Sequence, residues 1–173
     1  MVIPKTIFEI GTFDGRTTLN LAINATEESV IYTFDLPKEQ VDTASLNVSE
    51  SDQRLIKKNV TGSRFLSEQG KKLTAGRIIR QIYGDTATFD FSQYYNSIDL
   101  VFVDAAHTYE YVKNDSEIAL KLLRNGKGVI LWHDESISQE SKHVHKVACK
   151  LVYVFISLLF FITSELPDNL SFL

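Results

Sequence analysis

Five short hydrophobic segments, separated by longer polar or amphipathic stretches, constrain the fold of this chain more than any other feature. They are residues 6–10, 30–34, 77–83, 98–103 and 128–132. Each of the first four is followed by a glycine or an acidic residue, and the fifth is followed by a histidine and an aspartate. Nearly continuous hydrophobic runs of this length are typical of strands that are buried on both faces of a parallel sheet.

Two of the intervening stretches have helical periodicity. Leu19, Ala22 and Ile23 recur at helical spacing within residues 16–25, and residues 110–124 carry one hydrophobic face. Strands that alternate with helices, joined by right-handed crossovers, predict an α/β fold with a doubly wound, mostly parallel sheet and helices on both faces. Ligands of such sheets bind outside the carboxyl ends of the strands.

The composition bounds the size and the partners of the protein. With 173 residues, 44% of them hydrophobic, the chain can bury one sizeable core, so we expect a single domain over residues 1–173. A net charge of −4 without a basic run disfavours nucleic acid as a partner. The single cysteine, Cys149, and an amino terminus without signal-peptide features indicate a cytoplasmic protein.

Two segments are harder to interpret. Residues 151–163 form a hydrophobic run, but a spanning helix needs about 20 apolar residues, so a buried element is favoured over membrane association. Residues 38–76 are polar and without clear periodicity, and we expect a helix and a mobile loop there.

The ends of the first two strands carry residues suited to a nucleoside ligand. Gly11 allows a sharp turn and close approach of a ligand to the backbone, and Gly15 allows the next helix to begin close to the sheet. Asp35 ends the second strand, where a carboxylate can accept hydrogen bonds from both hydroxyls of a ribose. The alternatives are a purely structural turn and a capping or solvated acid.

The later strand ends carry further polar residues. Asp85 and Thr86 could meet the exocyclic amine of an adenine, although a plain turn is the alternative. His107 follows the fourth strand and has the intrinsic pKa of a general base, with a capping histidine as the alternative. Asp104 could join the residues after the fifth strand in binding a divalent cation; the complete predicted metal set is Asp104, His133 and Asp134.

Taken in order, these motifs resemble those of class I S-adenosylmethionine-dependent methyltransferases. The motifs are residues 8–15 (FEIGTFDG), 34–36 (FDL), 83–86 (YGDT), 98–110 (IDLVFVDAAHTYE) and 128–134 (GVILWHD). The narrower resemblance is to the branch of macrolide-sugar O-methyltransferases and related bacterial small-molecule enzymes. Fold alone does not establish function, so methyl transfer rests on the five motifs together.

The resemblance implies a Rossmann-like sheet of seven strands, whose last two form an antiparallel hairpin that would absorb the run after Lys150. It implies S-adenosylmethionine as cofactor and the hydroxyl of a small molecule as acceptor, with His107 at the position of a basic side chain in catechol-type relatives. The cofactor-binding residues that it implies are Glu9, Gly11, Thr12, Phe13, Gly15, Asp35, Leu36, Asp85, Thr86 and Asp104. His133 stands where relatives carry an acid or amide, which leaves magnesium, a softer metal or no metal.

Relatives generally carry helices before the first strand that cover the acceptor, whereas this sequence reaches its first strand at residue 6, so we expect the acceptor lid to be missing. Two other functions stay open. One is an NAD-dependent oxidoreductase, because an acid after the second strand also suits the ribose of NAD, although the glycine spacing argues against it. The other, which the missing lid favours, is a degenerate, non-catalytic binding or scaffold domain. A homo-oligomer is compatible with the sequence.

Overall fold

The computed structural model describes residues 3–133 and contains one sheet of five parallel strands. In chain order the strands are β1 (Thr6–Ile10), β2 (Val30–Asp35), β3 (Ile78–Tyr83), β4 (Leu100–Val103) and β5 (Val129–Trp132). Across the sheet their order is β3-β2-β1-β4-β5. The five predicted strands and the α/β class are confirmed, whereas the expected hairpin and the hydrophobic run at 151–163 lie outside the described residues.

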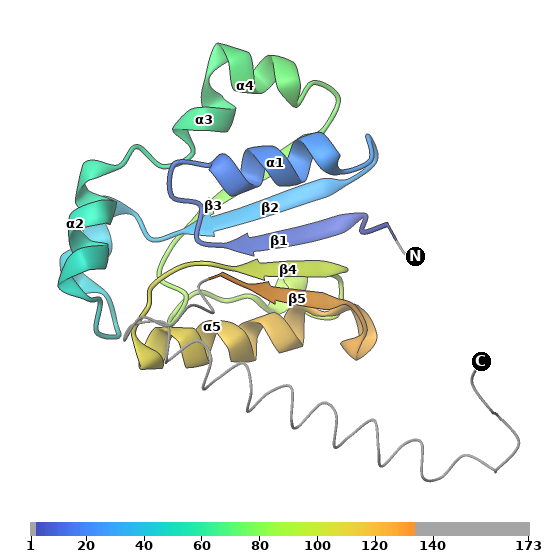
Figure 1. The fold of residues 1–173 in the computed structure, drawn as a ribbon. Coiled ribbons are helices and arrows are strands. Elements are labelled where there is room, and N and C mark those ends of the chain that lie inside the picture. Colours follow the sequence, from blue (N-terminus) through green and yellow to red (C-terminus); the bar gives the residue numbers. More distant parts are fainter. Residues whose placement is uncertain (1–2, 134–173) are drawn as a thin grey trace, which may run out of the picture.

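Helices cover both faces of the sheet, as the doubly wound prediction requires (Figure 1). The α-helices are α1 (Arg16–Asn24), α2 (Glu50–Lys58), α3 (Ser63–Leu66), α4 (Glu68–Leu73) and α5 (Tyr109–Leu122). The 3₁₀ helices are η1 (Lys38–Thr43), η2 (Ser92–Tyr94) and η3 (Arg124–Gly126). In Figure 1, α1 lies on one face, α5 lies on the other, and α2 lies beyond the carboxyl ends of the strands. None of these helices, all within residues 3–133, is long and apolar enough to cross a membrane.

The alternation of side chains along β1 explains why both faces are covered. Phe8 and Ile10 are fully buried in the larger core cluster, to which α5 contributes Leu122. Ile7 points to the opposite face and packs with Ala22 of α1. Because successive side chains of a strand point to opposite faces, a strand buried on both faces must be hydrophobic nearly throughout.

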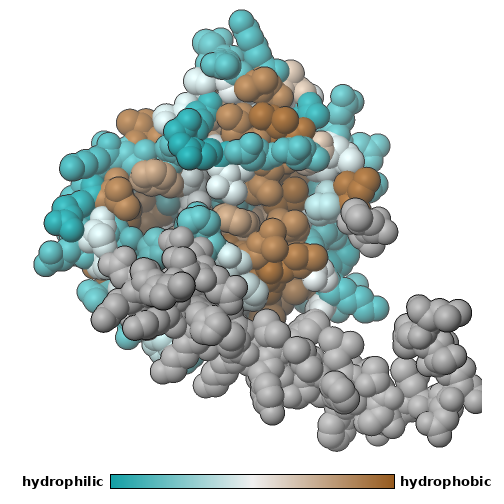
Figure 2. All heavy atoms as spheres, viewed as in Figure 1, coloured by the Kyte–Doolittle hydropathy of each residue, from teal (hydrophilic) through white to brown (hydrophobic). Residues whose placement is uncertain are grey.

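The last strand of the described sheet is less covered. Val129 and Leu131 of β5 are 50% and 45% exposed, while Ile130 and Trp132, which alternate with them, pack against the larger core. Figure 2, drawn in the same view as Figure 1, shows hydrophobic side chains in the part of the molecule that contains β5. The exposed pair therefore lies on the α1 side of the sheet.

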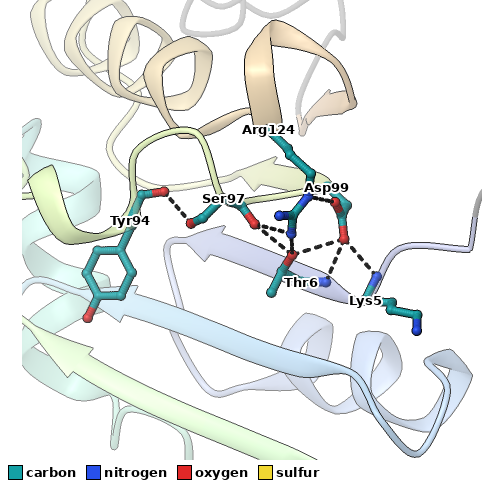
Figure 3. Close-up of polar contacts among 6 residues, drawn as sticks. All are labelled: Lys5, Thr6, Tyr94, Ser97, Asp99 and Arg124. Atoms are coloured by element: carbon teal, nitrogen blue, oxygen red, sulfur yellow. Dashed lines mark hydrogen bonds and ion pairs between the residues drawn. The ribbon is translucent and has the colours of Figure 1, made fainter.

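A polar network joins the segments at the amino ends of three strands (Figure 3). One carboxylate oxygen of Asp99 accepts hydrogen bonds from the backbone N–H groups of Lys5 and Thr6 at 3.0 and 2.9 Å. The other accepts from Nε of Arg124 at 2.6 Å, and the guanidinium also donates to the Ser97 carbonyl at 2.6 Å. The network thus connects the start of β1 with the segments before β4 and β5.

Residues 38–76, expected to form a helix and a mobile loop, instead form η1, α2, α3 and α4. The α-helices are too short to show periodicity in the sequence, but α2 carries local signals at both ends. Ser49 caps it by accepting a hydrogen bond from the backbone N–H of Asp52, and Lys57 and Lys58 lie in its last turn. Short capped helices of this kind are held in place by tertiary contacts more than by their own propensity.

Candidate active site

A cavity of about 240 Å³ opens at the carboxyl ends of the strands. It lies where the strand order reverses, between β1 and β4, which is the usual ligand position in a doubly wound sheet. We call it the switch-point cavity. Its lining includes the predicted residues Gly11, Phe13, Asp35, Leu36, Asp85, Thr86, Asp104, His107 and His133. The lining does not include Glu9, Thr12 or Gly15.

The turn after β1 brings Gly11 against the end of β4. Gly11 has a φ of +105°, and a Cβ atom built on it would lie 1.9 Å from the carbonyl oxygen of Asp104. The backbone N–H of Gly11 donates to the Phe34 carbonyl at 2.8 Å, so the turn also contacts β2. Only glycine combines this backbone conformation with so close an approach.

Gly15 and Thr12 shape the same turn from outside the cavity. Gly15 has a φ of +83° and precedes α1, and a Cβ atom on it would meet the ring of Phe65 at 2.6 Å. The hydroxyl of Thr12 is buried and lies 2.5 Å from that of Thr33. Both residues therefore position the turn, and their predicted contact with cofactor stays a prediction.

Asp35 ends β2 and lines the cavity. Burial raises the pKa of its carboxyl to about 6, although hydrogen bonds from the Thr61 side chain and the backbone of Leu36 and Phe13 oppose the rise. A desolvated carboxyl held by backbone donors is a fixed acceptor for ligand hydroxyls.

Asp85 follows the end of β3, the strand beside β2, and both of its carboxylate oxygens accept hydrogen bonds from protein donors. The backbone N–H groups of Ser45 and Ala87 donate to it at 2.7 and 2.9 Å, and the Tyr111 hydroxyl donates at 3.0 Å. Burial raises the pKa of Asp85, but these hydrogen bonds outweigh it and the net shift is downward. Asp85 therefore anchors the loop before α2 as well as lining the cavity.

Asp115 of α5 also lines the cavity and was not predicted from the sequence. It is 1% exposed, and burial raises its pKa to about 7, opposed by hydrogen bonds from Thr86 and Asn114. The sequence does contain a signal for Asp115. It is an aspartate on the otherwise hydrophobic face of the predicted helix, the face that includes Tyr111 and Ile118.

His107 contacts a second unpredicted residue, Asp52 of α2. The ring Nδ1 atom of His107 lies 2.9 Å from one carboxylate oxygen, and its backbone N–H donates to the other at 3.1 Å. Both residues line the cavity. The only sequence signal for Asp52 is its place three residues after Ser49, the pattern of a helix cap.

The predicted metal ligands are only partly described. Nδ1 of His133 lies 3.1 Å from a carboxylate oxygen of Asp104, so the structure brings these two together, while Asp134 lies outside the described residues. Within residues 3–133 no group of three or more histidine, cysteine, aspartate or glutamate residues could hold a metal ion. The metal site stays a prediction.

Glu9 lies apart from the cavity, on the α1 face of the sheet. One carboxyl oxygen accepts hydrogen bonds from the hydroxyls of Thr18 in α1 and Thr33 in β2, and the other is buried without a partner. Burial raises its pKa to about 7 against these hydrogen bonds. The position indicates a link between α1 and the sheet, and its predicted contact with cofactor is untested.

The fold is that of a class I, Rossmann-like methyltransferase. A model of the methyltransferase domain family matches residues 8–135, so the chain belongs to this family. The matched region contains β2, β3, β4, β5, the last three residues of β1 and every lining residue of the switch-point cavity.

Two solved structures are similar to this chain. The O-methyltransferase TomG from Streptomyces achromogenes, involved in tomaymycin synthesis and solved in complex with SAM, matches with a TM-score of 0.54 and 17% identity, over 87% of this chain and 62% of that one. A SAM-dependent methyltransferase from Methanosarcina mazei matches with a TM-score of 0.41 and 12% identity, over 71% and 49%. The chain thus spans about half to three fifths of these proteins. No curated protein matches it.

Proposed function

We propose that the protein transfers a methyl group from S-adenosylmethionine to a hydroxyl group of a small molecule. The observation that carries the proposal is that one cavity joins Gly11, Asp35 and His107. These three come from the ends of β1, β2 and β4, and they supply a close backbone approach, a hydroxyl acceptor and a base. TomG, which is similar in fold, was solved with SAM, and this supports the choice of cofactor.

The residues of the cavity fit a nucleoside cofactor. Asp35 would accept from the ribose hydroxyls, and Gly11 would allow the methionine portion to lie against the backbone. Asp85, Thr86 and Asp115 would lie on the adenine side, with Asp115 as a further hydrogen-bonding carboxyl.

When bound, S-adenosylmethionine supplies a methyl group on a positively charged sulfur that an acceptor oxygen can attack in line. The protein contributes chiefly by holding the two reactants in contact and in alignment. His107 would accept the hydroxyl proton on its ring as the acceptor oxygen formed its bond to the methyl group, while the bond from that group to sulfur broke and left its electron pair on the sulfur. A cation at Asp104, His133 and Asp134 would make that hydroxyl more acidic.

Calorimetric titration with S-adenosylmethionine tests the proposal directly, with and without magnesium. We expect saturable binding, weakened at least about tenfold by Asp35→Asn, because the variant loses a charged acceptor. Glu28→Gln is the matched control, since Glu28 is exposed and pairs with Lys5 at the other end of β1. It should bind as the wild type does.

Titration with NAD in the same experiment separates the competing functions. Binding of NAD without binding of S-adenosylmethionine would favour the NAD-dependent oxidoreductase over the methyltransferase. A folded wild-type chain that binds neither ligand would favour the non-catalytic scaffold, and either result would overturn the proposal.

A further inference from the structure

The contact between His107 and Asp52 joins segments that are 55 residues apart in the sequence. Asp52 holds His107 at two points, the ring Nδ1 atom and the backbone N–H. The Ser49 hydroxyl donates to the same oxygen that accepts from the backbone, at 2.8 Å. The carboxylate therefore sits in a fixed orientation, with one oxygen assigned to the ring.

Burial makes this pair more than a surface contact. The side chains of Asp52 and His107 are 9% and 24% exposed, and both line the cavity. Burial alone would raise the pKa of Asp52, but hydrogen bonds from the side chain and backbone of His107 outweigh it, so the pKa is lowered. Asp52 is thus a carboxylate at neutral pH, and a carboxylate only accepts hydrogen bonds.

A carboxylate facing Nδ1 fixes the tautomer of a neutral imidazole. Nδ1 must carry the proton in order to donate, which makes Nε2 the basic nitrogen of the ring. The other titratable groups of the cavity lining are Asp35, Asp85, Asp104, Tyr111, Asp115 and His133. Asp52 is the group that faces the ring at Nδ1, at 2.9 Å.

We propose that Asp52 is a positioning residue, which holds His107 as its Nδ1–H tautomer and so presents Nε2 as the base for methyl transfer. The catalytic meaning of this inference rests on the proposed function. When Nε2 takes the acceptor proton, a new N–H bond replaces the broken O–H bond, and Asp52 balances the positive charge of the resulting imidazolium.

The Asp52→Asn variant tests the proposal sharply, because the geometry dictates how the amide must lie. The Ser49 hydroxyl and the His107 backbone N–H both need an acceptor, so the amide oxygen takes their side. The amide nitrogen then faces Nδ1 and donates to it, which favours the opposite tautomer. The variant thus preserves shape while reversing the direction of one hydrogen bond.

Nitrogen NMR of the full chain, labelled with ¹⁵N-histidine, reads the tautomer at about pH 8, where an ordinary imidazole is neutral. His107→Gln identifies the signal among the four histidines. We expect the Nδ1–H form to predominate in the wild type and the Nε2–H form to predominate in Asp52→Asn. An unchanged tautomer in a folded Asp52→Asn variant would overturn the proposal.

Ser49→Ala distinguishes positioning from simple support of α2. It removes the cap of α2 but keeps the carboxylate on the ring, so we expect the wild-type tautomer. An equal change in both variants would mean that Asp52 acts only through the fold of α2, and would overturn the proposal. Failure of the wild type to bind S-adenosylmethionine would instead contradict the proposed function and leave the tautomer result standing.

Discussion

Among single residues, three buried carboxyl groups have raised pKa values, because burial disfavours the charged form of each. Glu9, Asp35 and Asp115 all have raised pKa values of about 6 or 7, and burial is the largest cause for each. Asp35 and Asp115 line the cavity, whereas Glu9 lies under α1. A raised carboxyl pKa makes the folded state less favourable as the pH rises.

Glu9→Gln should remove part of this pH dependence. Between pH 4.5 and about 7 the folded protein retains a proton on Glu9 that the unfolded chain has lost, so its contribution to stability declines over that interval. As the pH rises through this interval, the free energy of unfolding of the variant should increase relative to that of the wild type by up to roughly 1.4 kcal/mol per pH unit. Urea denaturation at about pH 5 and about pH 8 measures the difference.

The exposed Glu28→Gln provides the comparison, and its stability relative to the wild type should be the same at both pH values. If Glu9→Gln behaved like this control, Glu9 would be ionised in the folded protein. The buried carboxyl oxygen without a hydrogen-bond partner would then belong to a charged group, although burial of an unpaired charge is unfavourable.

Some residues of the cavity can be predicted from the sequence and others cannot, for a physical reason. The strand pattern predicts that residues at strand ends lie together at the carboxyl ends of the parallel strands, and these residues include Gly11, Asp35 and His107. Asp52 lies on a short helix without periodicity, and its distance from His107 depends on how residues 38–76 fold back over the sheet. No local pattern contains that information.

At the scale of elements, the turn between β1 and α1 is the most constrained connection. Gly11→Ala should cost at least about 3 kcal/mol of stability, because a Cβ atom 1.9 Å from the Asp104 carbonyl forces β1 and β4 apart. Thermal and urea unfolding measure the loss.

Gly76→Ala separates this collision from backbone strain. Gly76 also has a positive φ, +82°, but a Cβ atom there would have nothing within 4 Å. Its substitution should cost only about 1–2 kcal/mol, the ordinary penalty of a left-handed conformation. Similar losses in the two variants would show that the approach of Gly11 to β4 is looser than described.

Across the whole molecule, the Asp99 network and the proposed ligand cavity lie at opposite ends of the strands. The Asp99 network lies at the amino edge, and the switch-point cavity lies at the carboxyl edge (Figures 1 and 3). Burial raises the pKa of Asp99, but hydrogen bonds from Arg124 and Thr6 outweigh it and hold the pKa at about 2.

Asp99→Asn should therefore destabilise the protein by about 1–3 kcal/mol at neutral pH without changing affinity for S-adenosylmethionine more than about twofold. The loss should shrink as the pH falls from about 4 toward 2, because the wild-type carboxylate then becomes protonated too. Denaturation and calorimetry on the same sample measure both effects. A large loss of affinity would show that the two edges are coupled.

The strand segments, the α/β class and the polar residues at the carboxyl ends of the strands can be predicted from the sequence, because hydrophobic periodicity and strand-end residues are local properties. Three features of the site could not be predicted in this way: Asp52 contacts His107, Asp115 lines the cavity and Glu9 lies outside it. These facts depend on contacts between segments distant in sequence and on which face of a strand or helix is turned inward. Packing of the whole chain settles such contacts, and no single segment encodes them.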